Sequence, residues 1–155
     1  MTGWHAALWY SWIDRRQRTA ILALGDTTAV VLVVAVGLIE HGLDPLARPG
    51  YVLITATPFV LGWVLVGTLL GAYASVWWDR PVTGLLVLGP IWGLAAWTGA
   101  QIRATTLFPG GAQWVFVLVM VAAGLIALVA WRLVATVAYR RFWRTRDHCS
   151  DERPN

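Results

Sequence analysis

The chain has 155 residues, of which 58% are hydrophobic and only 13% charged, with a mean hydropathy of +0.63. Soluble domains carry about 25% charged residues, so these proportions exclude a soluble enzyme core, a disordered chain and a secreted disulfide scaffold. The basic excess, twelve arginines against eight acidic residues, lies beside apolar segments and leaves no basic face for a nucleic acid. We therefore predict an all-α polytopic membrane protein, a four-helix bundle whose surroundings are the lipid bilayer.

The first segment, residues 1–18, is rich in tryptophan and ends in three arginines. Trp4, Leu8 and Trp12 recur at intervals of four residues, which places them on one face of a helix. Indole rings are favoured at the boundary between membrane and water. This pattern predicts a short N-terminal helix lying in the cytoplasmic interface.

Four apolar stretches follow, each long enough for the ~20 residues of a transmembrane helix. They lie within a transmembrane domain over residues 19–139 and run approximately over Ala20–Ile39, Thr57–Trp77, Pro81–Gln101 and Trp114–Tyr139. None alternates with a period of two, so helices are the predicted spanning structure.

The sequence is compatible with two start positions for the second span, Tyr51 and Thr57. Thr57-Pro58 has the residue types of an N-cap followed by a first-turn proline. The six residues before it, from Tyr51, are mostly apolar and would extend the helix, with Pro58 as a kink inside it. Turn residues occur at Asp79-Arg80-Pro81 and at Phe108–Gly111.

Arginine placement predicts the orientation of the chain. Nine arginines lie before the first span, between the second and third, or after the fourth, whereas only Arg48 and Arg103 lie on the other side. The positive-inside rule then places both termini in the cytoplasm of a multi-pass cell-membrane protein. Residues 140–155 form a basic and then polar cytoplasmic tail, which we expect to be mobile from Arg144 onwards.

Asp26 and Arg132 are the charged residues inside the predicted spans. Asp26 lies eight residues after Arg18, and Arg132 lies eight residues before Arg140. A helix rises 1.5 Å per residue, so both lie ~12 Å inside the cytoplasmic face. Because an unpaired charge in the membrane is costly, we predict an ion pair between the first and last spans.

Three interpretations of these charges remain open. We favour a static clasp between the two helices, because a proton or ion relay needs several ionisable groups in series. In the third interpretation, Arg132 snorkels to the cytoplasmic surface.

A second polar group is predicted at the outer ends of the helices. Glu40 is twenty-two residues from Arg18, and Arg103 is twenty-two residues from Pro81, so both reach the outer boundary at ~33 Å. We expect their side chains within a few ångströms of one another, with His41 nearby. Ordinary interfacial charge is the favoured interpretation, and the mouth of a small polar site is the alternative.

Small residues suggest where helices pack closely. Gly67 and Gly71 in the second span, and Gly89 and Gly93 in the third, have the GxxxG spacing that lets helix backbones approach. We expect them to pack helices within the monomer. A homo-oligomer or a membrane-protein partner is left open.

Residues for metal binding or catalysis are sparse. Cys149 is the only cysteine, and the histidines are far apart in sequence, so we predict no metal and no cofactor. The sequence lacks HExxH, GxSxG and Walker motifs. We therefore do not expect an enzyme.

Several short motifs resemble those of one family in their order and spacing. They are Gly25-Asp26, His41-Gly42, Thr57-Pro58-Phe59, Gly62-Trp63, Arg103, Phe116, Val119 and Trp131-Arg132. Over about residues 20–139 the chain resembles an uncharacterised prokaryotic family of small four-span membrane proteins, domain-of-unknown-function family thirty fifty-four. The resemblance implies an integral membrane protein and supplies no activity, cofactor, substrate or catalytic residue.

Two functional classes follow from these observations. The favoured one is a structural or accessory four-helix membrane protein whose buried polar residues hold the helices together. The alternative is a small transporter or channel that uses Asp26 or the group of Glu40, His41 and Arg103.

Overall fold

The chain forms four long helices, and the computed structural model describes residues 3–73, 81–108, 111 and 113–150. The helices are α1 (Gly3–Glu40), α2 (Pro49–Leu69), α4 (Pro81–Arg103) and α5 (Trp114–Ser150). Each contains a segment long and apolar enough to cross a membrane, over Arg16–Glu40, Pro49–Leu69, Val82–Arg103 and Trp114–Ala138. No strand occurs in these described ranges. The protein is an all-helical integral membrane protein, as its composition predicts.

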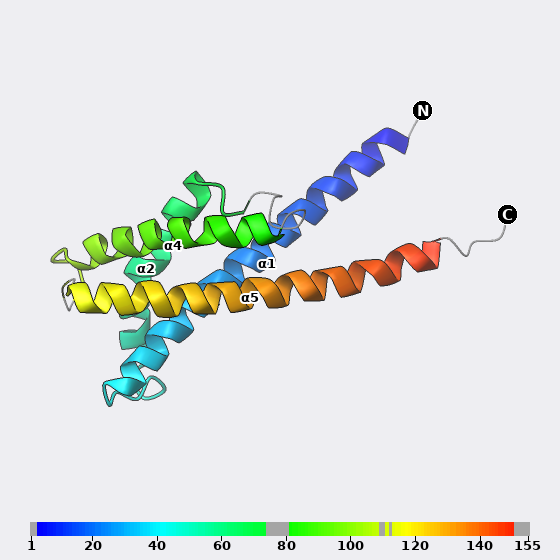
Figure 1. Cartoon of the computed structure of the whole chain (residues 1–155). Helices are drawn as coiled ribbons and strands as arrows, with labels where there is room; N and C mark the ends of the chain where they lie inside the picture. The colour runs from blue at the N-terminus through cyan, green and yellow to red at the C-terminus, as the bar shows by residue number, and fades with distance from the viewer. Residues whose placement is uncertain (1–2, 74–80, 109–110, 112, 151–155) are drawn as a thin grey trace.

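The four helices form a ring of neighbours. Helix α1 packs against α2 and α5, and α4 packs against the same two helices, so α1 and α4 lie diagonally across the bundle. In Figure 1, α1 crosses α5 obliquely, and the beginning of α1 and the end of α5 lie at the same end of the molecule. We call this end the terminal end. The opposite end, where α1 and α4 finish and α2 and α5 begin, is called the loop end.

Aromatic side chains fill the centre of the bundle. Trp63 of α2 and Trp92 of α4 are fully buried and meet edge to face, with ring centroids 5.8 Å apart. The Trp92 indole lies where a side chain on Gly124 of α5 would project, and its Nε1 donates a hydrogen bond to the Val121 carbonyl at 3.0 Å. Three helices are therefore joined around one tryptophan, and its polar atom is satisfied within the apolar core.

Two glycines end the first two spans by the same backbone motif. Gly42 and Gly71 adopt φ of +74° and +73°. At α2, the Ala72 N–H donates to the Gly67 carbonyl at 2.7 Å, the six-to-one hydrogen bond of a Schellman motif. Glycine adopts this left-handed conformation without a Cβ clash. The predicted end of the second span at Trp77 is therefore wrong, because Gly71 terminates the helix at Leu69.

The start of α2 favours the longer of the two predicted helices. The helix begins at Pro49, two residues before Tyr51, and Pro58 lies inside it. Thr57 is therefore not an N-cap, and its hydroxyl donates instead to the Leu53 carbonyl within the same helix at 2.7 Å. The predicted turns at Asp79–Pro81 and Phe108–Gly111 fall partly outside the described residues.

Helices α1 and α5 extend well beyond their membrane segments at the terminal end (Figure 1). The N-terminal segment is helical, but it continues directly into the first span and is not a separate helix. Helix α5 reaches Ser150, so residues 144–150 of the polar tail are helical, and the mobility of this tail stays a prediction. Neither residues 4–24 nor residues 125–150 contain glycine or proline, so no helix-breaking residue stops them at the membrane boundary. The side chains of Trp4, Leu8 and Trp12 lie outside the described part of the chain.

Candidate functional site

The structure brings Asp26 of α1 and Arg132 of α5 into a bidentate ion pair. Arg132 Nη2 donates to Asp26 Oδ2 at 2.6 Å, and Arg132 Nε donates to Asp26 Oδ1 at 3.2 Å. The relative exposure of the two side chains is 0% for Asp26 and 2% for Arg132. The parallel fork of the guanidinium matches the two carboxylate oxygens, which is the strongest geometry for such a pair. The first and last helices are thereby joined by charge within the membrane-spanning part of the bundle.

A third contact ties the ion pair to the end of α2. Arg132 Nη1 donates a hydrogen bond of 2.8 Å to the carbonyl oxygen of Ala72. Ala72 directly follows Gly71, so the Schellman turn places a backbone carbonyl at the guanidinium. The turn thus contributes an acceptor that a continuing helix would have used for its own backbone. Hydrogen bonds of Arg132 therefore connect α5 to α1 and to the turn that follows α2.

Two aromatic rings enclose the guanidinium. The Arg132 Cζ lies 5.8 Å from the ring centroid of Trp63 and 5.6 Å from that of Tyr73. These distances are within the ~6 Å range of cation–π attraction. The two rings also meet edge to face, with centroids 6.3 Å apart. The positive charge therefore lies in an aromatic recess, close to its counter-charge and shielded from solvent.

Tyr73 lies beyond the end of α2 and is half-buried. Burial, together with the nearby negative charge of Asp26, raises the pKa of the Tyr73 hydroxyl to about 12. Tyr73 is therefore protonated at neutral pH, and its hydroxyl is polar but uncharged beside the ion pair.

Trp131, next to Arg132 in the chain, packs onto the residue next to Asp26. The Trp131 indole occupies the space into which a side chain on Gly25 would project. Two consecutive residues of α5 thus meet two consecutive residues of α1, one pair by packing and the other by charge. The absence of a side chain at Gly25 brings the two helices close enough for the bidentate contact.

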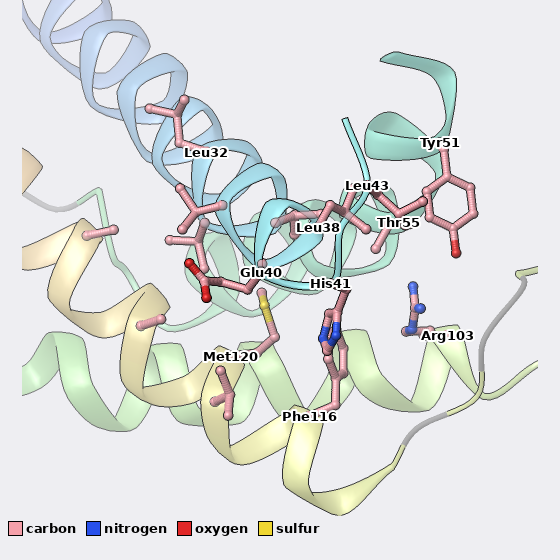
Figure 2. Close-up of a pocket in the computed structure, with 17 residues that line it drawn as sticks. Leu32, Leu38, Glu40, His41, Leu43, Tyr51, Thr55, Arg103, Phe116 and Met120 are labelled. Carbon is pink, nitrogen blue, oxygen red and sulfur yellow. The ribbon is translucent and has the colours of Figure 1, made fainter. Parts of the chain in front are cut away.

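The loop-end residues are arranged differently from the prediction. Glu40, His41 and Arg103 line one pocket of about 680 Å³, which Tyr51 and Thr55 also line. In Figure 2 the Glu40 carboxylate lies toward Met120, well apart from the Arg103 guanidinium. No ion pair joins Glu40 to Arg103, both of which are described. The predicted contact is corrected because α1 and α4 are diagonal helices, and equal depth does not bring their side chains together.

Arg103 has other partners. Its Nε donates to the Gly111 carbonyl at 3.3 Å, and its Cζ lies 5.0 Å from the centroid of the Phe116 ring. The side chain is 7% exposed, and its Nη1 has no hydrogen-bond partner. A buried, incompletely satisfied cation is therefore the main polar feature of the pocket.

The glycines predicted to pack helices do not do so. Gly71 lies in the turn after α2, and the nearest contacts of a Cβ on Gly67 would be Ala72 and Trp63. A Cβ on Gly89 or Gly93 would meet nothing within 4 Å. The close approach occurs instead between Gly62 of α2 and Gly99 of α4. A Cβ on either would overlap the backbone of the other helix.

The ion pair and all the residues that line the loop-end pocket lie within one region that a family model matches. The model of the family described as "Protein of unknown function (DUF3054)" matches residues 23–135. The chain belongs to this family. The resemblance predicted from the short motifs is thereby confirmed. No match to the chain was found among curated proteins or among solved structures.

Within the matched region, sequence reasoning missed Thr55, Trp63 and Tyr73 as parts of these sites. In the sequence, Trp63 is part of the motif Gly62-Trp63. Nothing in its position indicated that it would face Arg132, because apolar residues surround it on α2. The position of Tyr73 could have indicated its role. It lies two residues after Gly71, the glycine that ends α2 at the terminal end, where Arg132 also lies.

Proposed function

We propose that this family member is a non-catalytic structural or accessory membrane protein in which Asp26 and Arg132 form a permanent clasp. The observation that carries the proposal is the complete engagement of the pair: both carboxylate oxygens and three guanidinium nitrogens take part in hydrogen bonds among Asp26, Arg132 and Ala72. Breaking such a pair leaves a buried charge without compensation, which makes it a strong constraint on helix position.

The surroundings of the pair also support a clasp over a relay. Asp26 is 0% exposed and Arg132 2% exposed, so neither charged group is open to water. A relay would need a titratable neighbour that exchanges protons near neutral pH. Tyr73, the ionisable neighbour beyond the span, has a pKa of about 12. It therefore keeps its proton under those conditions.

The proposal is tested by measuring stability and proton flux on the same variants. The protein is reconstituted into vesicles with a trapped pH-sensitive dye, and its thermal unfolding is followed in detergent. The proposal expects Asp26→Asn to unfold at a lower temperature and to leave the proton permeability of the vesicles unchanged. An unchanged unfolding temperature combined with loss of a proton flux present in the wild type would reject the clasp and establish the relay.

We further propose that both termini face the cytoplasm. The nine-to-two distribution of arginines supports this orientation, and both termini at one end of the bundle are compatible with it (Figure 1). Cys149 is replaced by serine, and single cysteines are introduced at Thr2 and at Ala47 in the α1–α2 connection. An impermeant reagent added to intact cells should label position 47 and not position 2. Labelling of position 2 alone would reverse the orientation.

A further inference from the structure

We propose that the loop-end pocket is a binding site for an anionic phospholipid, whose phosphate contacts Arg103 and whose acyl chain lies between α1 and α5. The pocket has a volume of about 680 Å³, within the ~300–1,000 Å³ of small-molecule sites. Its polar lining residues all lie at the loop end. They are Glu40, His41, Tyr51, Thr55 and Arg103, and apolar side chains line the rest. An amphipathic ligand matches this separation of polar and apolar walls.

Arg103 supplies the charge for the headgroup. Its Nη1 is buried without a hydrogen-bond partner, although Nε is bonded to Gly111. In Figure 2 the hydroxyl of Tyr51 points toward the guanidinium, while the Glu40 carboxylate is turned away from it. A guanidinium binds phosphate oxygens through paired hydrogen bonds. A phosphate at this position would satisfy the free nitrogen and neutralise a buried cation.

Thr55 is a second unsatisfied group in the same pocket. Six other threonines on the described helices donate their hydroxyls to the carbonyl four residues earlier: Thr27, Thr28, Thr57, Thr68, Thr98 and Thr136. The Thr55 hydroxyl is buried, with 4% relative exposure, and has no partner. Two buried donors without acceptors therefore line the polar end of one pocket, and both suit an anionic oxygen.

The apolar part of the pocket has the dimensions of one membrane leaflet. Its wall on α1 runs from Leu32 to Glu40, nine residues whose Cα atoms span ~12 Å along the helix axis. One leaflet contributes about half of the ~30 Å hydrocarbon core. Leu32 and Val36 are more than half exposed, so this wall is open to the surrounding lipid. An acyl chain can enter sideways from the bilayer.

A neighbouring pocket gives room for the headgroup. This second pocket, of about 340 Å³, shares His41, Arg103, Phe116 and Val119 with the first and is also lined by Gly111 and Gln113. Arg103 thus lies between an apolar groove and a more polar recess. An apolar helix face of a second copy would fill the groove without supplying the anionic oxygens that the buried donors of Arg103 and Thr55 suit. This charge requirement favours the phospholipid.

The test measures lipid retention by native mass spectrometry. The full-length protein is delipidated in detergent and titrated with phosphatidylglycerol or phosphatidylcholine of identical acyl chains. The wild type should retain one phosphatidylglycerol with about tenfold preference, because the cationic choline of phosphatidylcholine offsets the phosphate charge that Arg103 attracts. Arg103→Gln should abolish the preference. Arg48→Gln, which removes an exposed loop-end arginine, is the matched control and should behave as wild type.

A second pair of variants tests the groove without changing Arg103. Ala123 lines the pocket, whereas its exposed neighbour Ala122 lines none of the described pockets. Ala123→Phe should reduce retention of both lipids at least tenfold, and Ala122→Phe should not. This pair remains decisive if Arg103→Gln fails to fold.

Five outcomes would overturn the proposal, and the first four concern lipid retention and oligomeric state. They are equal retention of the two lipids by the wild type, unchanged preference in Arg103→Gln, equal retention by Ala123→Phe and Ala122→Phe, and a lipid-free dimer that Ala123→Phe dissociates. Displacement of the lipid by millimolar inorganic phosphate would also overturn it, since that result marks a site for the free anion.

Discussion

The indole of Trp131 lies in the space that a side chain on Gly25 would occupy, directly beside the ion pair between Arg132 and Asp26. Close packing and charge pairing therefore reinforce one another at a single crossing of α1 and α5. Because Gly25 has no side chain, α1 and α5 approach closely. At this separation the Arg132 guanidinium reaches both carboxylate oxygens of Asp26.

The first prediction concerns Gly25. Gly25→Ala should destabilise the protein by about 1–3 kcal/mol, because its methyl group displaces the Trp131 ring. Gly37→Ala on the same helix is the control, since a Cβ there meets nothing within 4 Å. Thermal unfolding in detergent measures both. Recovery of stability in Gly25→Ala/Trp131→Leu would assign the loss to the ring, and equal unfolding temperatures for the two single variants would contradict the prediction.

The second prediction concerns the charge of the clasp. Asp26→Asn should lower the unfolding temperature by roughly 10 °C, from the 3–5 kcal/mol cost of breaking a buried pair. Asp44→Asn is the matched control, because Asp44 lies in the α1–α2 connection and only its Oδ1 accepts a backbone hydrogen bond, from Leu46, which an asparagine retains. Asp26→Arg/Arg132→Asp should recover part of the loss. Equal unfolding temperatures for Asp26→Asn and Asp44→Asn would show that the ion pair between Asp26 and Arg132 does not stabilise the protein.

The third prediction separates packing glycines from exposed ones. Gly62→Ala and Gly99→Ala should be more destabilising than Gly25→Ala, because a Cβ at either site meets backbone of the neighbouring helix and cannot be relieved by a side-chain shift. Gly89→Ala and Gly93→Ala should unfold at or above the wild-type temperature, since the added methyl group favours the helix. The reverse order of stabilities would show that the GxxxG pair of α4 is the true contact.

The fourth prediction is a pH dependence assigned to Tyr73. Its pKa of about 12 in the folded protein exceeds the ordinary value of 10.0 expected when the chain unfolds. Between these values the unfolded state releases a proton that the folded state retains, so this contribution to stability is present below pH 10 and lost as the pH rises to about 12. Tyr73→Phe should flatten the decline over this interval.

Spectroscopy checks the same group directly. The difference between the ultraviolet pH titrations of the wild type and Tyr73→Phe isolates one phenol of the four tyrosines. Its ionisation should have a midpoint near pH 12. A midpoint near pH 10 would show that the hydroxyl is neither buried nor close to a negative charge.

The amino-acid sequence by itself determined the features of this protein that depend on depth in the membrane, namely the spanning helices and the level of the charged residues. Four apolar runs required four spanning helices, because the bilayer core leaves backbone groups no other partner. Counting residues from the flanking arginines placed Asp26 and Arg132 at one depth, and the cost of an isolated charge made them partners. Family membership followed from short motifs at characteristic spacings, and the match over residues 23–135 confirmed it.

The tertiary structure decided what depends on the direction around each helix. Glu40 and Arg103 have matched depths as well, yet they lie on diagonal helices and do not pair. The same limit explains the glycines: spacing identified Gly89 and Gly93, but only the packing of α2 on α4 shows that Gly62 and Gly99 meet. Counting residues along a span gives the depth of a side chain. A contact also depends on the direction of the side chain about the helix axis, and the crossing of all four helices sets which directions meet.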